Sequence, residues 1–136
     1  MKIYKNKISK INVHCLPNSI PVNEISKYSI KIKPSTRQFL MVGRIVPQKN
    51  PELFIQIKKQ LEKNGVSGQF IWVGDGDEVL KEKLLSSGVK VTGMLSRNAV
   101  WELMSEALFF IQTSLWEGMP LTIMEAQCIG LPVVSN

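Results

Sequence analysis

From residue 37 onward, the 136-residue chain alternates short apolar runs with longer amphipathic stretches. Residues 39–42 are all apolar and end at Gly43, a pattern typical of a buried strand. Four later runs are also short and rich in apolar residues. They predict strands at residues 70–73, 89–92, 108–111 and from residue 132.

Between the predicted strands, apolar residues recur at helical spacing, so each of these stretches predicts a helix with one buried face. The first of them begins at Pro51, a residue that suits the first helical position, and Gly65 follows its end. Two further helices are expected after Asp77 and after Ser96, and a last one from Pro120 to Gly130. Strands alternating with helices predict right-handed βαβ units. The predicted fold class is therefore α/β, with a doubly wound, Rossmann-like parallel sheet whose ligand lies beyond the carboxyl ends of the strands.

The net charge of +6 belongs to residues 1–36, which hold seven lysines against Glu24 alone. This segment has no arginine and only two aromatic residues, Tyr4 and Tyr28, so it offers little for base stacking or bidentate phosphate binding. We expect no nucleic-acid partner, while peripheral contact with an acidic membrane stays open. Residues 1–36 are predicted to be a basic connector and remnant of a first domain, and residues 37–136 a ligand-binding domain.

Composition excludes several other classes of protein. The longest uninterrupted apolar run, residues 107–111, is too short to span a bilayer, and no secretory leader is recognisable. Cys15 and Cys128 form neither a disulfide framework nor a zinc-binding pattern. A cytoplasmic location is therefore expected.

The first candidate site follows the first predicted strand, at Gly43, Arg44 and Lys49. Glycine lets the backbone approach a ligand closely, the guanidinium offers a planar fork for phosphate oxygens, and lysine adds a point charge. Two cations at one rim suggest a diphosphate site. The alternative is that both side chains are simply solvated.

After the second predicted strand comes Gly74-Asp75-Gly76-Asp77. A dinucleotide-binding fingerprint would need a glycine at the position of Val79, so that interpretation fails. The two aspartates have the spacing of a metal-binding pair, but Asp77 directly precedes a helix and is better explained as its N-cap. We expect no metal or other cofactor, and favour a glycine-rich turn that presents backbone N–H groups to a ligand.

The last predicted helix is preceded by Glu117 and carries Glu125. Pro120 at its first position leaves neighbouring N–H groups open to an anion. Because the helix is almost wholly apolar, it is predicted to be buried, and Glu125 then needs a polar partner. That partner is either a cation in a structural ion pair or a ligand with adjacent hydroxyls, such as a ribose.

These motifs, in this order at the ends of successive strands, resemble the retaining, nucleotide-sugar-dependent glycosyltransferases of family 4, which have the two-domain GT-B fold. Residues 37–136 are similar to the C-terminal, donor-binding half of that architecture, and residues 14–18 resemble its interdomain connector. The motifs that carry the resemblance are Gly43-Arg44 with Lys49, Val73-Gly74-Asp75-Gly76, Glu117 and Glu125 with Gly118 and Pro120 between them, and Gly130-Leu131-Pro132-Val133-Val134.

The resemblance implies a site for a UDP- or GDP-sugar donor. In it, Arg44 and Lys49 bind the diphosphate, Glu117 holds the sugar hydroxyls and Glu125 accepts from the ribose. Catalytic roles are implied for Glu117, Arg44 and Lys49. The remaining implied donor-binding residues contribute main chain or line the cleft; they are Gly43, Gly74, Gly76, Met94, Gly118, Met119, Pro120 and Leu121.

The resemblance further implies a glycan or lipid-linked acceptor, surface polysaccharide biosynthesis, and work at the inner face of the membrane. Ser19 and Asp77 depart from the family's usual Gly and Pro. The family's first domain and its last elements have no counterpart here, so the domain is expected to be incomplete at its C-terminus and the chain alone inactive. Two alternatives stay open: a non-catalytic nucleotide-sugar-binding fragment, and a nucleotide-sugar epimerase of GT-B fold. His14, in the connector, is expected to be structural.

Overall fold

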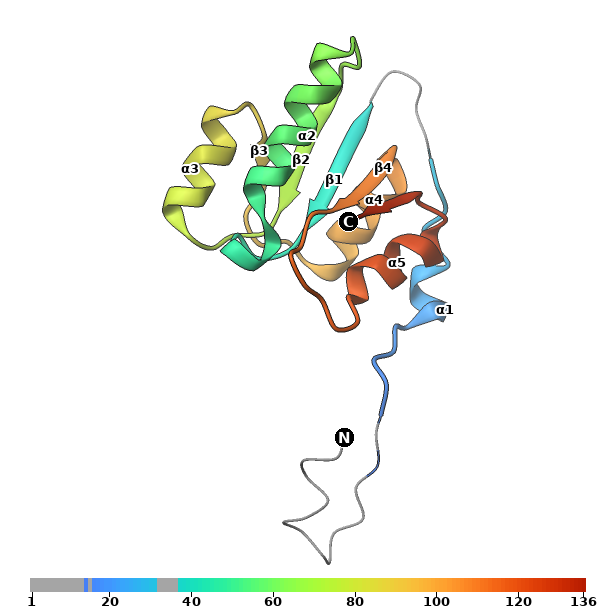
Figure 1. Cartoon of the computed structure of the whole chain (residues 1–136). Helices are drawn as coiled ribbons and strands as arrows, with labels where there is room; N and C mark the ends of the chain where they lie inside the picture. The colour runs from blue at the N-terminus through green and yellow to red at the C-terminus, as the bar shows by residue number, and fades with distance from the viewer. Residues whose placement is uncertain (1–13, 15, 32–36) are drawn as a thin grey trace, which may run out of the picture.

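The computed structural model describes residue 14, residues 16–31 and residues 37–136 (Figure 1). Its five strands form one parallel sheet in the order β3-β2-β1-β4-β5. The strands are β1 (Gln38–Val42), β2 (Gln69–Val73), β3 (Lys90–Val91), β4 (Phe109–Gln112) and β5 (Val133–Ser135). The helices are α1 (Val22–Ile25), a 3₁₀ turn (Pro47–Lys49), α2 (Pro51–Lys63), α3 (Glu78–Ser86), α4 (Arg97–Glu106) and α5 (Leu121–Ile129).

Alternating residues of the strands build two hydrophobic layers, one on each face of the sheet. Phe39 and Met41 of β1 join the layer covered by α2 and α3, whereas Leu40 joins the layer covered by α1, α4 and α5. Figure 1 shows α2 on one side of the sheet and α4 on the other. Since successive side chains of a strand point to opposite faces, a strand that is apolar throughout requires helices on both sides. The predicted doubly wound, Rossmann-like parallel fold is confirmed.

Several predicted element ends are confirmed by their caps. The side chain of Ser96 accepts a hydrogen bond from the Ala99 N–H at the start of α4, and Gly130 closes α5 in the left-handed conformation (φ 86°). The strand predicted at residues 89–92 is shorter in the structure, where β3 spans Lys90–Val91 and the N–H of Val89 donates to the carbonyl of Leu84 in α3.

The hydrophobic core includes residues that precede the domain boundary predicted at residue 37. Ile25 of α1 is fully buried in the layer formed with α4 and α5, and the Tyr28 ring meets Trp101 edge-on at 5.6 Å between centroids. The N–H of Lys31 donates to the carbonyl of Ser105. Part of the expected connector therefore belongs to the hydrophobic core.

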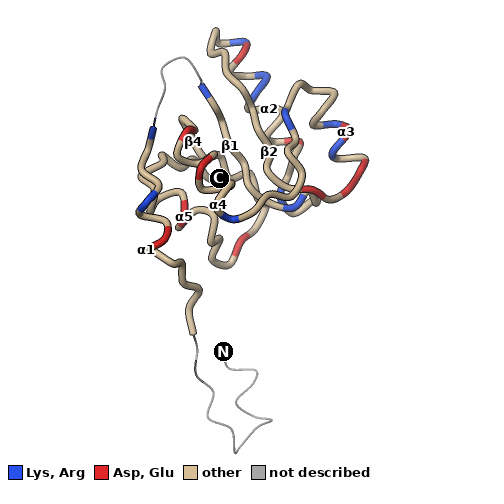
Figure 2. The backbone as a smooth tube through the Cα atoms, turned by 180° about the vertical axis from the view of Figure 1, so that it is seen from behind, with Lys and Arg blue, Asp and Glu red and all other residues tan. Residues whose placement is uncertain are grey.

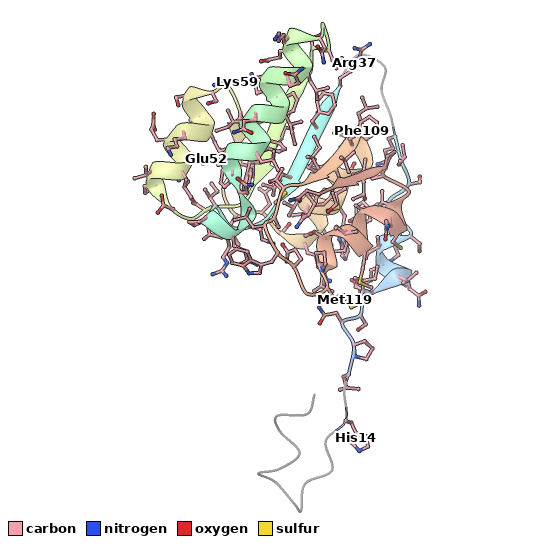
Figure 3. The ribbon with its side chains drawn as sticks, viewed as in Figure 1. His14, Arg37, Glu52, Lys59, Phe109 and Met119 are labelled. Atoms are coloured by element: carbon pink, nitrogen blue, oxygen red, sulfur yellow. The ribbon has the colours of Figure 1, made fainter. Side chains whose placement is uncertain are left out.

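Other expectations for residues 1–36 fall mainly outside the described residues. His14 and Leu16 are described; both are exposed and neither lies in a strand. Figure 3 shows His14 away from the sheet, so the expected structural role of this histidine is not seen.

Helix α5 is less buried than its composition predicts. Glu125, Ala126 and Ile129 are buried, but Leu121 and Gln127 are exposed, because α5 packs on the rest of the described chain with one side only. The sequence suggested that Pro120 is the first helical residue of α5. In the structure it is the N-cap of this helix. The apolar composition of this helix therefore overstates its burial.

Helices α2 and α3 both carry charged residues of both signs. In Figure 2, basic and acidic residues are intermixed along these two helices. Ion pairs join Lys58 to Glu62, and Lys83 of α3 to Glu52 of α2. No helix within the described ranges is both long and apolar enough to cross a membrane.

Candidate functional site

The carboxyl ends of β1 and β2 and the loop after β3 surround a pocket of about 240 Å³. Four of the predicted site residues lie around this pocket, which the structure thereby brings together. The complete lining is Val42, Gly43, Arg44, Val73, Gly74, Met94, Leu95 and Val100. The pocket lies where a doubly wound sheet is expected to bind its ligand.

Gly74 and Gly76 allow the loops after β1 and β2 to touch backbone to backbone. A Cβ at Gly74 would lie 2.1 Å from the carbonyl oxygen of Gly43, and one at Gly76 would lie 2.2 Å from that of Ile45. The N–H of Ile45 also donates to the carbonyl of Asp75 at 2.9 Å. Contact between these two loops is therefore sufficient reason for glycine at both positions, whether or not a ligand approaches them.

The two aspartates of the second loop are engaged within the chain. Asp77 caps α3 by accepting from the Leu80 N–H at 2.9 Å, which confirms the N-cap prediction. Asp75 pairs with Lys81 at 3.0 Å, and hydrogen bonds from Lys81 and from the Gly76 N–H hold the pKa of Asp75 below its usual value. Among the described residues, no group of three or more His, Cys, Asp or Glu is placed to hold a metal ion.

Lys49 and Glu117, both predicted site residues, form an ion pair with each other. Lys49 ends the 3₁₀ turn that links β1 to α2, and its carbonyl accepts from the Thr113 hydroxyl at 2.7 Å. Both charged side chains are about four-fifths buried. The loops after β1 and β4 thus meet through opposite charges at the carboxyl edge of the sheet.

Glu117 has two further partners, Gln112 and Ser114. The Gln112 amide donates to Glu117 Oε1 at 2.9 Å and to the Ser114 hydroxyl oxygen at 2.8 Å. Burial by itself raises the pKa of Glu117, but hydrogen bonds from Lys49, Ser114 and Gln112 outweigh it and leave the pKa below its usual value. The carboxylate is therefore ionised at neutral pH.

The main chain of the loop between β4 and α5 is held from two other parts of the molecule. Gln48 exchanges hydrogen bonds with it, accepting from the Leu115 N–H at 2.8 Å and donating to the Trp116 carbonyl at 3.0 Å. Asn18 donates to the carbonyl of Met119 at 3.0 Å, and Figure 3 shows Met119 beside the segment that leads into α1. A Cβ at Gly118 would meet nothing within 4 Å, so no contact in this structure demands glycine there.

Glu125 is only 6% exposed and is paired with Arg97 of α4. The guanidinium donates to Glu125 Oε1 from Nε at 3.1 Å and from Nη2 at 2.9 Å. It also lies 5.1 Å from the centre of the Trp101 ring, a cation–π distance. Of the two partners expected for Glu125, the structural ion pair is observed.

Sequence reasoning missed Gln112 and Arg97. Gln112 had a visible signal, because a polar residue directly follows an apolar strand run. Arg97 had none, because it lies on a different helix from the carboxylate that it pairs with.

The chain matches the family model described as "Glycosyl transferases group 1" over residues 22–136, and it belongs to this family. It is 33% identical over 153 residues to the "UDP-Gal:alpha-D-GlcNAc-diphosphoundecaprenol alpha-1,3-galactosyltransferase" of Escherichia coli, with 95% of this chain and 38% of that protein covered. It is 28% identical over 128 residues to the "Amylovoran biosynthesis glycosyltransferase AmsK" of Erwinia amylovora, with 83% and 31% covered. The chain thus spans well under half the length of these relatives.

Similar solved structures include the pneumococcal O-GlcNAc transferase GtfA in complex with UDP and GlcNAc, with a TM-score of 0.64, and TarM, with 0.63. Both are 21% identical to this chain and cover 79% of it, and the chain covers 22% and 23% of them. At that identity the likeness shows a shared fold.

Proposed function

We propose that residues 37–136, together with the packed segment around α1, are the C-terminal, donor-binding domain of a retaining glycosyltransferase that uses a nucleotide-diphosphate sugar. The observation that carries the proposal is the gathering of Gly43, Arg44, Gly74 and Met94 around one pocket, at the sheet edge where Lys49 meets Glu117. Membership of the glycosyl transferases group 1 family supports it.

The diphosphate is assigned to Arg44, Lys49 and the start of α5. The leaving diphosphate gains negative charge as the bond to the sugar breaks, so fixed cations and a helix N-terminus stabilise the transition state electrostatically. Lys49 is held about four-fifths buried, where screening by solvent is weak. These groups do this work without a metal ion.

The sugar and the ribose are assigned to the two glutamates. Glu117 is ionised and accepts hydrogen bonds from sugar hydroxyls. Both hydrogen bonds from Arg97 go to Oε1 of Glu125, so its second oxygen, Oε2, is the atom assigned to the ribose. The ion pair with Arg97 and the contact with the ribose are therefore compatible.

The acceptor is assigned to the class of glycans and lipid-linked sugars, in surface polysaccharide biosynthesis at the cytoplasmic face of a membrane. Relatives named for amylovoran biosynthesis and for a diphosphoundecaprenol acceptor support this class. We expect the 136-residue chain alone to bind a donor without transferring its sugar. Turnover by this chain alone would contradict that expectation.

Titration calorimetry with UDP, UMP, GDP and GMP tests the diphosphate assignment. The diphosphate is expected to bind at least about tenfold tighter than the monophosphate, and Arg44→Ala to cost about 1.5–3 kcal/mol of diphosphate binding. Lys59→Ala is the control, because Lys59 is exposed on α2 away from the pocket (Figure 3). Equal affinities for di- and monophosphate would remove the assignment.

A further inference from the structure

Gln112, the last residue of β4, is a buried polar side chain that no motif assigns to the site. It is 2% exposed, and its amide nitrogen donates both to Ser114 and to Glu117. The strand holds its backbone in place, because Gln112 is in register with Ser135 of β5. Glu117, by contrast, lies in the loop between β4 and α5. A rigid strand thus carries the hydrogen-bond donor, Gln112, and a loop carries the hydrogen-bond acceptor, Glu117.

Hydrogen-bond chemistry fixes the orientation of the amide. An ionised carboxylate can only accept, so the NH₂ group of Gln112 must face Glu117, and the Ser114 hydroxyl that accepts from Gln112 can direct its own proton to the same carboxylate. Gln112, Ser114 and Glu117 therefore close a triangle of hydrogen bonds. Reversing the amide would set its carbonyl against the carboxylate.

This orientation leaves the Gln112 carbonyl oxygen, Oε1, buried without a hydrogen-bond partner among the described residues. An unpaired buried carbonyl is unfavourable for folding, and an apolar side chain of similar size would avoid that cost. Stability alone therefore does not explain glutamine at this position. The contact that it makes with Glu117 does.

Lys49 and Gln112 both contact the same oxygen of Glu117, Oε1. We propose that Gln112 is a positioning residue: it holds Glu117 Oε1 against Lys49 and so turns the other oxygen, Oε2, toward the donor sugar. Fixing the direction of a loop carboxylate in advance spares the ordering that binding would otherwise require. The identity of the ligand, but not the positioning itself, rests on the proposed function.

The first test needs no ligand. Gln112→Met keeps the length of the side chain and removes the amide, so the NMR-measured pKa of the Glu117 carboxyl is expected to rise toward its ordinary value, with Lys49 still in contact. Gln38→Met is the matched control, because Gln38 also has a buried carbonyl oxygen without a partner in the described chain but lies at the opposite end of its strand. An unchanged Glu117 pKa in Gln112→Met would overturn the proposal.

The second test compares binding of UDP-galactose with binding of UDP. Gln112→Met is expected to reduce the advantage of the sugar-bearing ligand about tenfold, as loss of a hydrogen bond to a charged group would, and to leave UDP itself unchanged. Gln38→Met should change neither affinity. Suppose that Glu117→Gln leaves the ratio of the affinities for UDP-galactose and UDP unaltered, while Gln112→Met shifts the pKa of Glu117. In that case the positioning holds and the sugar-binding function is wrong.

Loss of the fold would not end the test. If Gln112→Met fails to fold, Ser114→Ala removes another corner of the triangle with a smaller change in volume. It is expected to shift the Glu117 pKa in the same direction, and an unshifted pKa would overturn the proposal.

Discussion

Glu117 and Glu125 belong to the same loop-and-helix segment, yet their carboxylates are held in different ways. Glu117 is the more exposed of the two and has side-chain partners from two separate regions, the turn after β1 and the end of β4. Glu125 is nearly inaccessible to solvent and relies on Arg97, whose own side chain is 51% exposed. The more buried carboxylate of the two thus has fewer partner residues.

The difference separates two ways of compensating the burial of a carboxylate. Several hydrogen-bond donors fix the direction of the Glu117 carboxylate, so loss of one donor leaves the others in place. A single cation compensates the burial of Glu125, so loss of that cation leaves a charge with little access to water. Glu117 is suited to present one oxygen in a set direction, and Glu125 to link two helices.

Removing each cation in turn gives the largest expected effect. Arg97→Met should lower the free energy of unfolding by about 2–3 kcal/mol, because Glu125 is left buried and unpaired. Lys49→Met should lower it by less than about 1 kcal/mol, because Glu117 keeps two donors and partial access to water. Urea unfolding of both variants measures this. Equal losses would show that the extra donors of Glu117 contribute nothing.

Neutralising each carboxylate should separate their roles in binding. Glu125→Gln is expected to weaken UDP and UDP-galactose alike, by about tenfold, whereas Glu117→Gln should weaken only UDP-galactose by a similar factor. Thermal melts with and without ligand check this on folded protein. If ligand stabilises Glu125→Gln as much as it stabilises the parent chain, Glu125 has no contact with the ribose.

Acid should reveal the preorganised carboxylate. The pKa of Glu117 is lower in the folded chain than its ordinary value of 4.5, so its contribution to stability is present above that pH and is lost as the pH falls through the folded-state pKa. The parent chain should therefore lose about 1 kcal/mol or less relative to Glu117→Gln on acidification. Urea unfolding on both sides of pH 4.5 measures the difference. Parallel curves would contradict the lowered pKa.

The smallest expected effect is that of a chelator. Asp75 is paired with Lys81, and Asp77 caps the start of α3. Unlike the two glutamates, these aspartates are therefore not assigned to ligand binding. We expect the affinity for UDP to be the same with and without EDTA. A strict requirement for Mg²⁺ or Mn²⁺ would revive the metal-binding interpretation of these aspartates.

The elements were predictable because each carries its own local signal. An apolar run predicts a buried strand, and Ser96, Asp77 and Gly130 mark helix ends through bonds within one turn. α1 was missed because its four residues and single fully buried side chain, Ile25, stand in a lysine-rich segment whose charge dominates the pattern. Only packing against α4 and α5 shows that this segment belongs to the domain.

For the candidate site, the sequence indicated residue types at the strand ends, but not which side chains pair. Glycines, cations and glutamates at strand ends identified Lys49 and Glu117, but not that these two side chains would meet. The partners Gln112 and Arg97 depend on which elements become neighbours in space, which local spacing does not encode. Local spacing likewise does not show why position 74 needs glycine, because the backbone that approaches it is that of Gly43, in the loop after β1.

The strand order has a consequence for how the molecule assembles. β1 pairs with β2, which follows it after one helix, and with β4, which comes only after β2, α3, β3 and α4. Because the entropic cost of closing a loop grows with its length, we expect the unit β1-α2-β2 to form before β4 joins it. The contact of Gly74 with Gly43 belongs to that early unit, whereas Lys49 meets Glu117 only once β4 is in place. A refolding chain should therefore form the glycine contact between the loops after β1 and β2 earlier than the ion pair of Lys49 with Glu117.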